Sequence, residues 1–216
     1  MEKGALEKRL TDIDKTKAFR RIYVMGCGRS GTWLLTGVMS TFNDVEIVAK
    51  ELAIEHFGLF QTNRSILILK RDSVAYQRIK EIPQQIEIVF IVRHPFDVLT
   101  SYLPISRRPY HILPHRWLGE MLALQYLLDA GRKNTKIIRY EDLVSKPVES
   151  QTELAKFFTL QIRLPLNQVV KMDQNKIGKY KLDTTKIEYL QRIRSDLGDM
   201  LSWVAKTYNY DVSLSF

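Results

Sequence analysis

Short apolar runs alternate along the chain with segments in which apolar residues recur every three or four positions. Runs of four to seven residues rich in valine, isoleucine and leucine are typical of buried strands. Five such runs occur, at residues 21–25, 45–49, 66–69, 86–92 and 136–140. This alternation predicts a parallel sheet covered by helices on both faces. We therefore expect an α/β fold, a three-layer sandwich around a central, mainly parallel sheet of about five strands.

Four other segments carry the apolar spacing of a helix that packs one face against a core. They are residues 33–39, 120–130, 147–158 and 190–204. The second stops at Gly131, a residue suited to the position after a helix, and the third begins at Pro147, a residue suited to a first turn. We assign these apolar stripes to the core and give them no chemical role.

Length, composition and charge narrow the class of protein. The 216 residues, of which 45% are hydrophobic and 26% charged, predict one globular domain at 21–216 after a charged flank at 1–20. No apolar run approaches the ~18 residues of a membrane helix, and no secretory segment is recognised, so the expected location is the cytoplasm. The single cysteine, Cys27, excludes an internal disulfide. The net charge of +9 favours anionic partners.

A glycine-rich loop joins the strand at 21–25 to the following helix. Residues 26–32 read Gly-Cys-Gly-Arg-Ser-Gly-Thr. Such a loop, placed between a strand and a helix N-terminus, presents backbone N–H groups to an anion. The predicted phosphate site comprises Gly28, Arg29, Ser30, Gly31 and Thr32. The loop lacks the Lys-Ser or Lys-Thr of nucleoside triphosphate sites, which disfavours a magnesium-dependent kinase, and the alternative is a tight turn that binds nothing.

A second anion site is predicted after the strand at 86–92. Arg93 stands at the end of this strand, and Ser101 follows eight residues later, two turns into a predicted helix. A guanidinium and a hydroxyl can together bind a second phosphate. In the alternative interpretation, Arg93 is a surface cation and Ser101 has no role.

Four segments taken together resemble the sulfotransferase family that uses 3′-phosphoadenosine 5′-phosphosulfate (PAPS). The glycine loop resembles the family's 5′-phosphosulfate motif, and residues 93–102, Arg-His-Pro-Phe-Asp-Val-Leu-Thr-Ser-Tyr, resemble its 3′-phosphate motif. Residues 139–143, Arg-Tyr-Glu-Asp-Leu, are similar to a segment whose tyrosine lies near the adenine. Residues 175–181 resemble the stretch that closes over the nucleotide. The four matches occur in the order that the family has.

The resemblance implies PAPS as co-substrate, 3′-phosphoadenosine 5′-phosphate (PAP) as product, and no metal. It also implies donor contacts from Trp33, Tyr140, Lys176, Gly178 and Lys179. Trp33 stands where the family has the second threonine of its phosphosulfate motif, so the hydroxyl expected there is missing. The chain is also short for the family, which suggests a trimmed acceptor-binding side.

Sulfuryl transfer needs in-line positioning and positive charge around the moving group and the leaving phosphate oxygen. Arg29 can supply this charge, and so can Lys70, which follows the strand at 66–69 at the edge where open α/β sheets bind ligands. The acceptor hydroxyl also needs a general base. Glu51 lies in a segment that resembles one branch of the family, and Asp72 stands where another branch has a catalytic histidine. Either can be the base, and the third alternative is that neither is.

Two other functions stay open. A small nucleotide or sugar kinase with an atypical loop would use ATP and magnesium. A non-catalytic nucleic-acid-binding module would use the positive net charge, but the basic residues are scattered among acidic ones. His111 and His115 have the spacing of a helical metal pair, but Pro114 lies between them, so no metal site is predicted.

The acceptor is the second substrate of the proposed transfer. We expect a small-molecule or glycan hydroxyl, or less readily an amine, and neither nucleic acid nor membrane as a partner. Basic and aromatic residues of the segment after Ser101 would suit an anionic or sugar-like acceptor. These residues are Arg107, Arg108, Tyr110 and Arg116.

Overall fold

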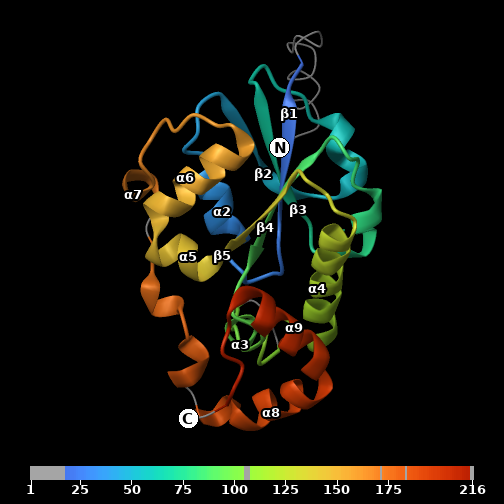
Figure 1. The fold of residues 1–216 in the computed structure, drawn as a ribbon, viewed down its shortest axis with the longest axis vertical. Helices are drawn as coiled ribbons and strands as arrows, with labels where there is room; N and C mark the ends of the chain where they lie inside the picture. The colour runs from blue at the N-terminus through green and yellow to red at the C-terminus, as the bar shows by residue number, and fades with distance from the viewer. Residues whose placement is uncertain (1–17, 105–107, 171, 183, 215–216) are drawn as a thin grey trace.

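The computed structural model describes residues 18–104, 108–170, 172–182 and 184–214, and its centre is a single sheet. The strands are β1 (Arg20–Met25), β2 (Val45–Leu52), β3 (Ile66–Arg71), β4 (Glu87–Val92) and β5 (Thr135–Arg139). They lie in the order β2-β3-β1-β4-β5, and every neighbouring pair is parallel (Figure 1). The prediction of about five mainly parallel strands is confirmed.

Apolar side chains leave the sheet on both faces and form two core clusters. Along β3, Leu67 and Leu69 belong to one cluster and Ile66 and Ile68 to the other, because successive side chains of a strand point to opposite faces. The first cluster includes residues of α4 (Pro114–Asp129), α8 (Ile187–Asp196) and α9 (Gly198–Tyr208). The second includes residues of α2 (Thr32–Met39), α5 (Tyr140–Ser145), α6 (Pro147–Phe158) and α7 (Leu166–Val169). Figure 1 shows α4 on one side of the sheet and α2, α5 and α6 on the other, so the predicted three-layer arrangement is confirmed.

The shorter elements lie in the connections. They are α3 (Pro95–Leu99) and the 3-10 helices η1 (Ile54–Leu59), η2 (Ala75–Glu81), η3 (Gln174–Lys176), η4 (Lys179–Leu182) and η5 (Thr184–Lys186). After β1 the chain builds β2 and β3 on one side of this strand and then crosses to β4 on the other. Open α/β sheets bind ligands where the strand order switches in this way, outside the carboxyl ends of the strands.

Two predicted positions near this edge are wrong. The helix expected to contain Ser101 ends at Leu99, because the hydroxyls of Thr100 and Ser101 bond to backbone oxygens of the preceding turn and compete with further helix. Glu51 belongs to β2 rather than following it, since β2 continues to Leu52 after a register shift. Both residues still lie at the carboxyl edge of the sheet.

The apolar stripe at 190–204 belongs to two helices, because α8 ends at Asp196 and Leu197 leaves helical geometry with φ −119° and ψ 18°. Tyr140 was expected to end the last strand, and it opens α5 instead. Of the charged flank predicted at 1–20, residues 1–17 lie outside the described residues. Among the described residues, none of the helices has the length and apolar character needed to cross a membrane.

Candidate functional site

Two glycines determine the shape of the loop between β1 and α2. Gly31 has φ 105°, and a Cβ at this position would lie 2.6 Å from Tyr140 Cδ2. Gly26 has φ 140°, and a Cβ there would lie 2.5 Å from the Ile91 carbonyl oxygen. Both positions combine a left-handed backbone with a close neighbour, so both require glycine. The loop therefore passes close to β4 and α5, which bring the other predicted segments to it.

The loop residues have different surroundings. Ser30 is buried, and its hydroxyl donates to the Cys27 carbonyl oxygen at 2.6 Å, so this hydroxyl is engaged within the loop. Thr32 is also buried and begins α2. Within the described part of the chain, no side chain caps the first turn of α2. Arg29 is exposed and has a left-handed backbone with φ 68°. The loop thus presents a helix N-terminus and a cation to solvent, as an anion site requires.

Segments far apart in the sequence line one pocket of about 250 Å³ beside this loop. Its lining residues are Arg29, Gly31, Thr32, Trp33, Leu34, Arg93, Tyr140, Asp173 and Lys176. The loop, the end of β4, the start of α5 and η3 meet here. The structure therefore brings together residues of all four segments that carry the resemblance.

A second pocket of about 250 Å³ shares Arg29, Arg93 and Lys176 with the first. Its other lining residues are Asp97, Thr100, Ser101, Tyr102, Lys179, Tyr180 and Lys186. Arg93 and Ser101 thus line the same pocket, although Ser101 lies beyond the end of α3 and its hydroxyl donates to the Val98 carbonyl oxygen at 2.7 Å. Basic side chains outnumber acidic ones in both pockets, which suits a ligand with two anionic groups.

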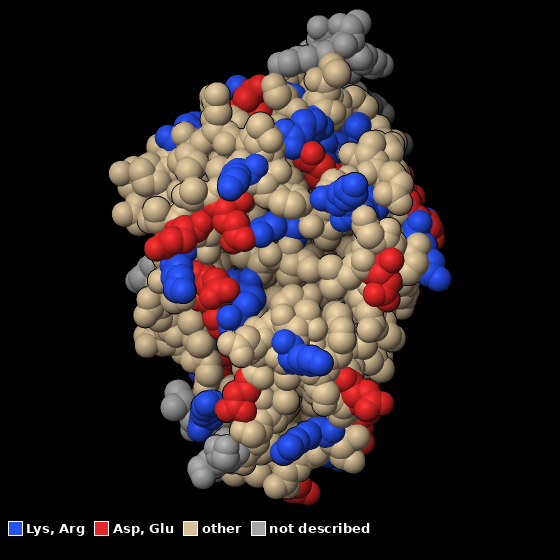
Figure 2. Space-filling view, viewed as in Figure 1, with Lys and Arg blue, Asp and Glu red and all other residues tan. Residues whose placement is uncertain are grey.

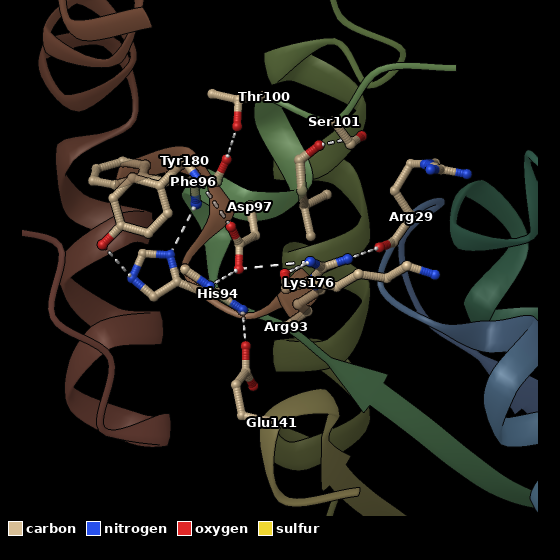
Figure 3. A network of polar contacts seen from close by, with 12 residues as sticks. Arg29, Arg93, His94, Phe96, Asp97, Thr100, Ser101, Glu141, Lys176 and Tyr180 are labelled. Carbon is tan, nitrogen blue, oxygen red and sulfur yellow. Dashed lines mark hydrogen bonds and ion pairs between the residues drawn. The ribbon is translucent and has the colours of Figure 1, made fainter. Parts of the chain in front are cut away.

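Arg93 joins the segments that meet between the two pockets (Figure 3). Its Nη1 donates to the Arg29 carbonyl oxygen at 3.0 Å, and its Nη2 donates to the Lys176 carbonyl oxygen. The guanidinium carbon lies 4.4 Å from the centroid of the Tyr140 ring. Its Nε is buried and has no hydrogen-bond partner among the described residues. Arg93 therefore holds the pocket together and keeps one donor that the described part of the chain does not use.

Asp97 is not among the predicted site residues, yet it fixes the segment expected to close over a nucleotide. Its buried carboxylate accepts the backbone N–H of Gly178 at 2.8 Å and that of Tyr180 at 3.1 Å. It also lies 3.6 Å from Arg93 Nη2, one helical turn earlier. The sequence offers one hint of this role, a carboxylate four residues after the predicted phosphate-binding arginine.

His94 anchors the same region from the core side (Figure 3). Its backbone N–H donates to Glu141 Oε1 at 2.9 Å, and its Nδ1 accepts the Phe96 N–H at 3.2 Å. Its Nε2 lies 2.8 Å from the Asp211 carbonyl oxygen, so a neutral ring with the proton on Nε2 satisfies both nitrogens. The ring stacks on Tyr180 with centroids 4.6 Å apart. Burial lowers the pKa of His94, which favours this neutral form.

The predicted transfer residues lie together at the carboxyl ends of β2 and β3. Lys70 is buried, and its Nζ lies 2.6 Å from Glu51 Oε1 and 3.9 Å from the centroid of the Trp33 ring. The Glu51 side chain stays 49% exposed, and Trp33 is 65% exposed. Because Trp33 also lines the first pocket, the Lys70–Glu51 pair lies next to the loop, and its Glu51 side is open to a second molecule.

The other candidate base, Asp72, has a local role in the turn after β3. Its Oδ1 accepts the Val74 N–H at 3.1 Å, and its own backbone N–H donates to the Leu52 carbonyl oxygen at 3.2 Å. The described contacts of Lys70 are with Glu51 and Trp33 and do not include Asp72. The structure therefore pairs Glu51 with the predicted cation and places Asp72 in a turn.

A buried ion pair on the opposite face of the sheet was not predicted. Arg71 Nη1 lies 3.4 Å from Glu120 Oε1, and both residues are buried. Burial raises the pKa of Glu120 to about 7, while Arg71 and Arg116 act to lower it. The sequence hint is a carboxylate on the apolar stripe of the helix predicted at 120–130.

The remaining predicted residues lie at or beyond the rim of the site. Lys176 and Lys179 are exposed, and Gly178 has φ 68°, a backbone that favours glycine. Arg107 lies outside the described residues. In the described ranges, no three or more histidine, cysteine, aspartate and glutamate side chains gather as a metal site would need.

Charge is mixed over the face of the molecule seen in Figure 2. Basic and acidic side chains are interspersed there, and neither sign covers a continuous area. Nucleic-acid-binding proteins instead gather their basic residues on one face or stripe. This face therefore lends no support to a nucleic-acid-binding module.

No protein-family model and no curated protein sequence matches the chain. Among solved structures, the sulfotransferase domain of the Synechococcus PCC 7002 olefin synthase has a TM-score of 0.66 and 16% identity, over 92% of this chain and 98% of that one. The sulfotransferase domain from the curacin biosynthetic pathway has a TM-score of 0.59 and 16% identity, over 84% and 99%. Retinol dehydratase in a complex with retinol and PAP has a TM-score of 0.50 and 12% identity, over 91% and 86%.

These likenesses concern the fold, because the identities are low. They cover most of this chain and nearly the full length of the two sulfotransferase domains. This chain has the sulfotransferase fold.

Proposed function

We propose that this chain is a sulfotransferase that moves the sulfuryl group of PAPS to a hydroxyl of an acceptor and releases PAP. One observation carries the proposal: residues of four distant segments meet around two adjoining pockets rich in basic side chains. The sulfotransferase fold supports it, and so does the PAP in the complex of the similar retinol dehydratase. The acceptor would be a small molecule or a glycan.

The residues in the two pockets fit a donor with anionic groups at both ends. The loop, Arg29 and the N-terminus of α2 suit the 5′-phosphosulfate. Arg93 and Ser101 suit the 3′-phosphate, with Lys179 in the same pocket. Tyr140 lines the first pocket between these ends and suits the adenine. Arg93 lines both pockets, so its guanidinium lies next to the places proposed for the two anionic ends of the donor.

The proposed chemistry requires little beyond positioning and charge. A bond forms between the acceptor oxygen and sulfur, while the bond from sulfur to the phosphate oxygen of the donor breaks. Glu51 accepts the proton of the acceptor hydroxyl. Lys70 and Arg29 offset the negative charge that develops on the leaving phosphate oxygen. The half-exposed position of Glu51 lets the acceptor reach it.

The donor site is tested by thermal unfolding with PAP, with ADP and with ATP plus magnesium. At ~100 times its dissociation constant, a ligand of the native state adds about 2.7 kcal/mol of stability. For a chain of this size, that corresponds to a rise of roughly 5–10 °C in Tm. We expect this rise in Tm with PAP and not with ADP or with ATP plus magnesium. In Arg93→Ala, we expect PAP to give no such rise.

Arg163→Ala is the matched control for the loss of one positive charge. Arg163 is exposed and donates to the Ser40 carbonyl oxygen, at the end of α2 away from the loop. This variant should keep the full response to PAP. A rise with ATP and magnesium but not with PAP would favour a kinase instead, and no response to any nucleotide would contradict both enzymes.

The choice of base is tested by comparing Glu51→Gln with Asp72→Asn in an acceptor screen with PAPS. General-base catalysis contributes about 10²- to 10⁴-fold to a rate. We expect Glu51→Gln to lose transfer by about that factor while still binding PAP. Asp72→Asn should keep most of its activity, because Asp72 bonds within a turn. The reverse result would make Asp72 the base.

A further inference from the structure

A cluster of charged side chains lies behind the phosphate loop, on the α4 face of the sheet. It consists of Arg71 at the end of β3, and of Arg116 and Glu120 one turn apart on α4. Arg71 and Glu120 are buried, with Arg71 Nη1 3.4 Å from Glu120 Oε1. Lys70 precedes Arg71 and packs against Trp33 on the other face. The end of β3 therefore sends one cation to each side of the loop.

Both guanidinium groups of the cluster lie near the loop at Gly28. A Cβ added to Gly28 would lie 3.4 Å from Arg116 Nη2 and 3.7 Å from Arg71 Nη2. The two groups are therefore close to the loop one residue before Arg29. An anion bound to the loop has this cluster directly behind its backbone donors, so it interacts with the net charge of the cluster.

The charges and hydrogen-bonding groups of this buried cluster are incompletely paired. Two guanidinium groups face one carboxylate, and neither Glu120 oxygen has a hydrogen-bond partner among the described residues. Arg116 Nε is also buried without such a partner in this part of the chain. A buried ion pair with incomplete hydrogen bonding adds little to stability compared with apolar residues of the same size. Its position behind the loop points to a role in binding instead.

We propose that Glu120 is a positioning residue for the donor: it holds Arg71 beside the loop and, by gaining or losing a proton, sets the positive charge that Arg71 and Arg116 present to the bound nucleotide. The inference rests on the proposed function, because it takes the loop to bind the phosphosulfate end of the donor. Glu120 acts through the two arginines and touches no substrate.

The surroundings of Glu120 make its protonation relevant near neutral pH. Burial raises its pKa to about 7; Asp72 adds to this effect, and the two arginines oppose it. Burial also raises the pKa of the Tyr23 hydroxyl and of the Cys27 thiol, two titratable groups near the cluster, so both stay neutral in this range. An anion on the loop favours the protonated carboxyl. By linkage, binding of the nucleotide then takes up a proton near pH 7.

The test is calorimetric titration of the full chain with PAP between about pH 6 and pH 8, in buffers of different ionisation enthalpy. We expect the affinity to fall about three- to ten-fold as the pH rises, because Glu120 then ionises behind the loop. Glu120→Gln keeps the shape and the neutral state. After correction for the titration of PAP itself, this variant should bind PAP at pH 8 as tightly as the wild type does at pH 6. It should also lack the proton uptake assigned to Glu120.

Glu149→Gln, on the exposed surface of α6, is the matched control and should show the proton uptake of the wild type. Because Glu120→Gln can fail to fold, a second measurement needs no variant. This measurement uses the wild type labelled with ¹³C at the glutamate carboxyls. The chemical shift of one carboxyl should titrate with a midpoint near pH 7, and this midpoint should move to higher pH when PAP binds.

Each outcome decides the inference. Equal proton uptake in the wild type and in Glu120→Gln would overturn it. A Glu120 carboxyl whose titration midpoint is the same with and without PAP would also overturn it. PAP binding itself would then still support the proposed function. If the wild type bound no PAP at any pH, the proposed function and this inference would fail together.

Discussion

Lys70 and Arg71 are neighbours at the end of β3, and the comparison between them separates two uses of a buried cation. Each is buried, and each faces a glutamate. Glu51, the partner of Lys70, is 49% exposed, whereas Glu120, the partner of Arg71, is fully buried. A half-exposed carboxylate such as Glu51 can take a proton from the acceptor, whereas a fully buried one such as Glu120 acts through the charge that it carries.

Arg71→Met is expected to have the largest effect on stability. It removes the ion-pair partner of the buried Glu120, and at about pH 8, where the wild-type carboxyl is ionised, loss of one partner of a buried ion pair costs about 3–5 kcal/mol. Lys70→Met is the matched control, because Glu51 stays at the surface where water solvates it. Its cost should remain below about 1 kcal/mol. Urea denaturation of both variants measures the difference, and equal losses would remove the distinction between the two faces.

Asp97 sharpens the comparison, because it is a buried carboxylate with its hydrogen bonds satisfied. Unlike Glu120, it accepts two backbone N–H groups, those of Gly178 and Tyr180. Asp97→Asn removes the charge and one of the two acceptors, and a hydrogen bond to a charged group contributes about 1.5–3 kcal/mol. We expect faster amide hydrogen exchange at 178–180 and weaker PAP binding by about tenfold or more.

Asp129→Asn is the control for this change, since Asp129 is exposed at the end of α4. It should alter neither the exchange at 178–180 nor the affinity for PAP. Unchanged exchange in Asp97→Asn would mean that the segment is held by its other contacts, such as the stacking of Tyr180 on His94.

The parts of the site that the sequence predicts are those determined by local chain geometry. Gly26 and Gly31 must bend the chain at the end of β1, and the apolar runs on either side of the loop define a strand and a helix. Arg93 lies at the end of β4 for the same local reason. Strand ends of a parallel sheet share one edge, so residues at these ends meet wherever the intervening helices go.

The parts that the sequence does not predict depend on packing between distant segments. The Asp97 carboxylate finds its N–H partners 81 and 83 residues later in the chain. The partner of Arg71 is chosen by how α4 lies on the sheet, and periodicity marks Glu120 only as a polar residue on an apolar stripe. Ser101 was placed in a helix because hydrophobic spacing does not report hydroxyl bonds to the preceding turn.

The smallest expected effect is a change in how stability depends on pH. Burial lowers the pKa of His94 from its ordinary value of 6.5, so the unfolded chain binds this proton more readily than the folded chain. The stability that neutral His94 contributes is therefore complete above about pH 6.5 and is lost as the pH falls below it. Glu120 acts in the opposite direction, because its raised pKa makes the folded chain hold the proton until the pH rises through about 7.

These opposed contributions are separated by His94→Asn, which keeps an acceptor for the Phe96 N–H at the start of α3. Asparagine does not titrate, so the wild type should lose its stability advantage over this variant as the pH is lowered from about 7 to about 5. Urea denaturation at each pH measures this difference. A constant difference for His94→Asn would show that His94 takes up its proton in the folded chain, and that the contacts with Asp211 and Tyr180 rearrange to admit it.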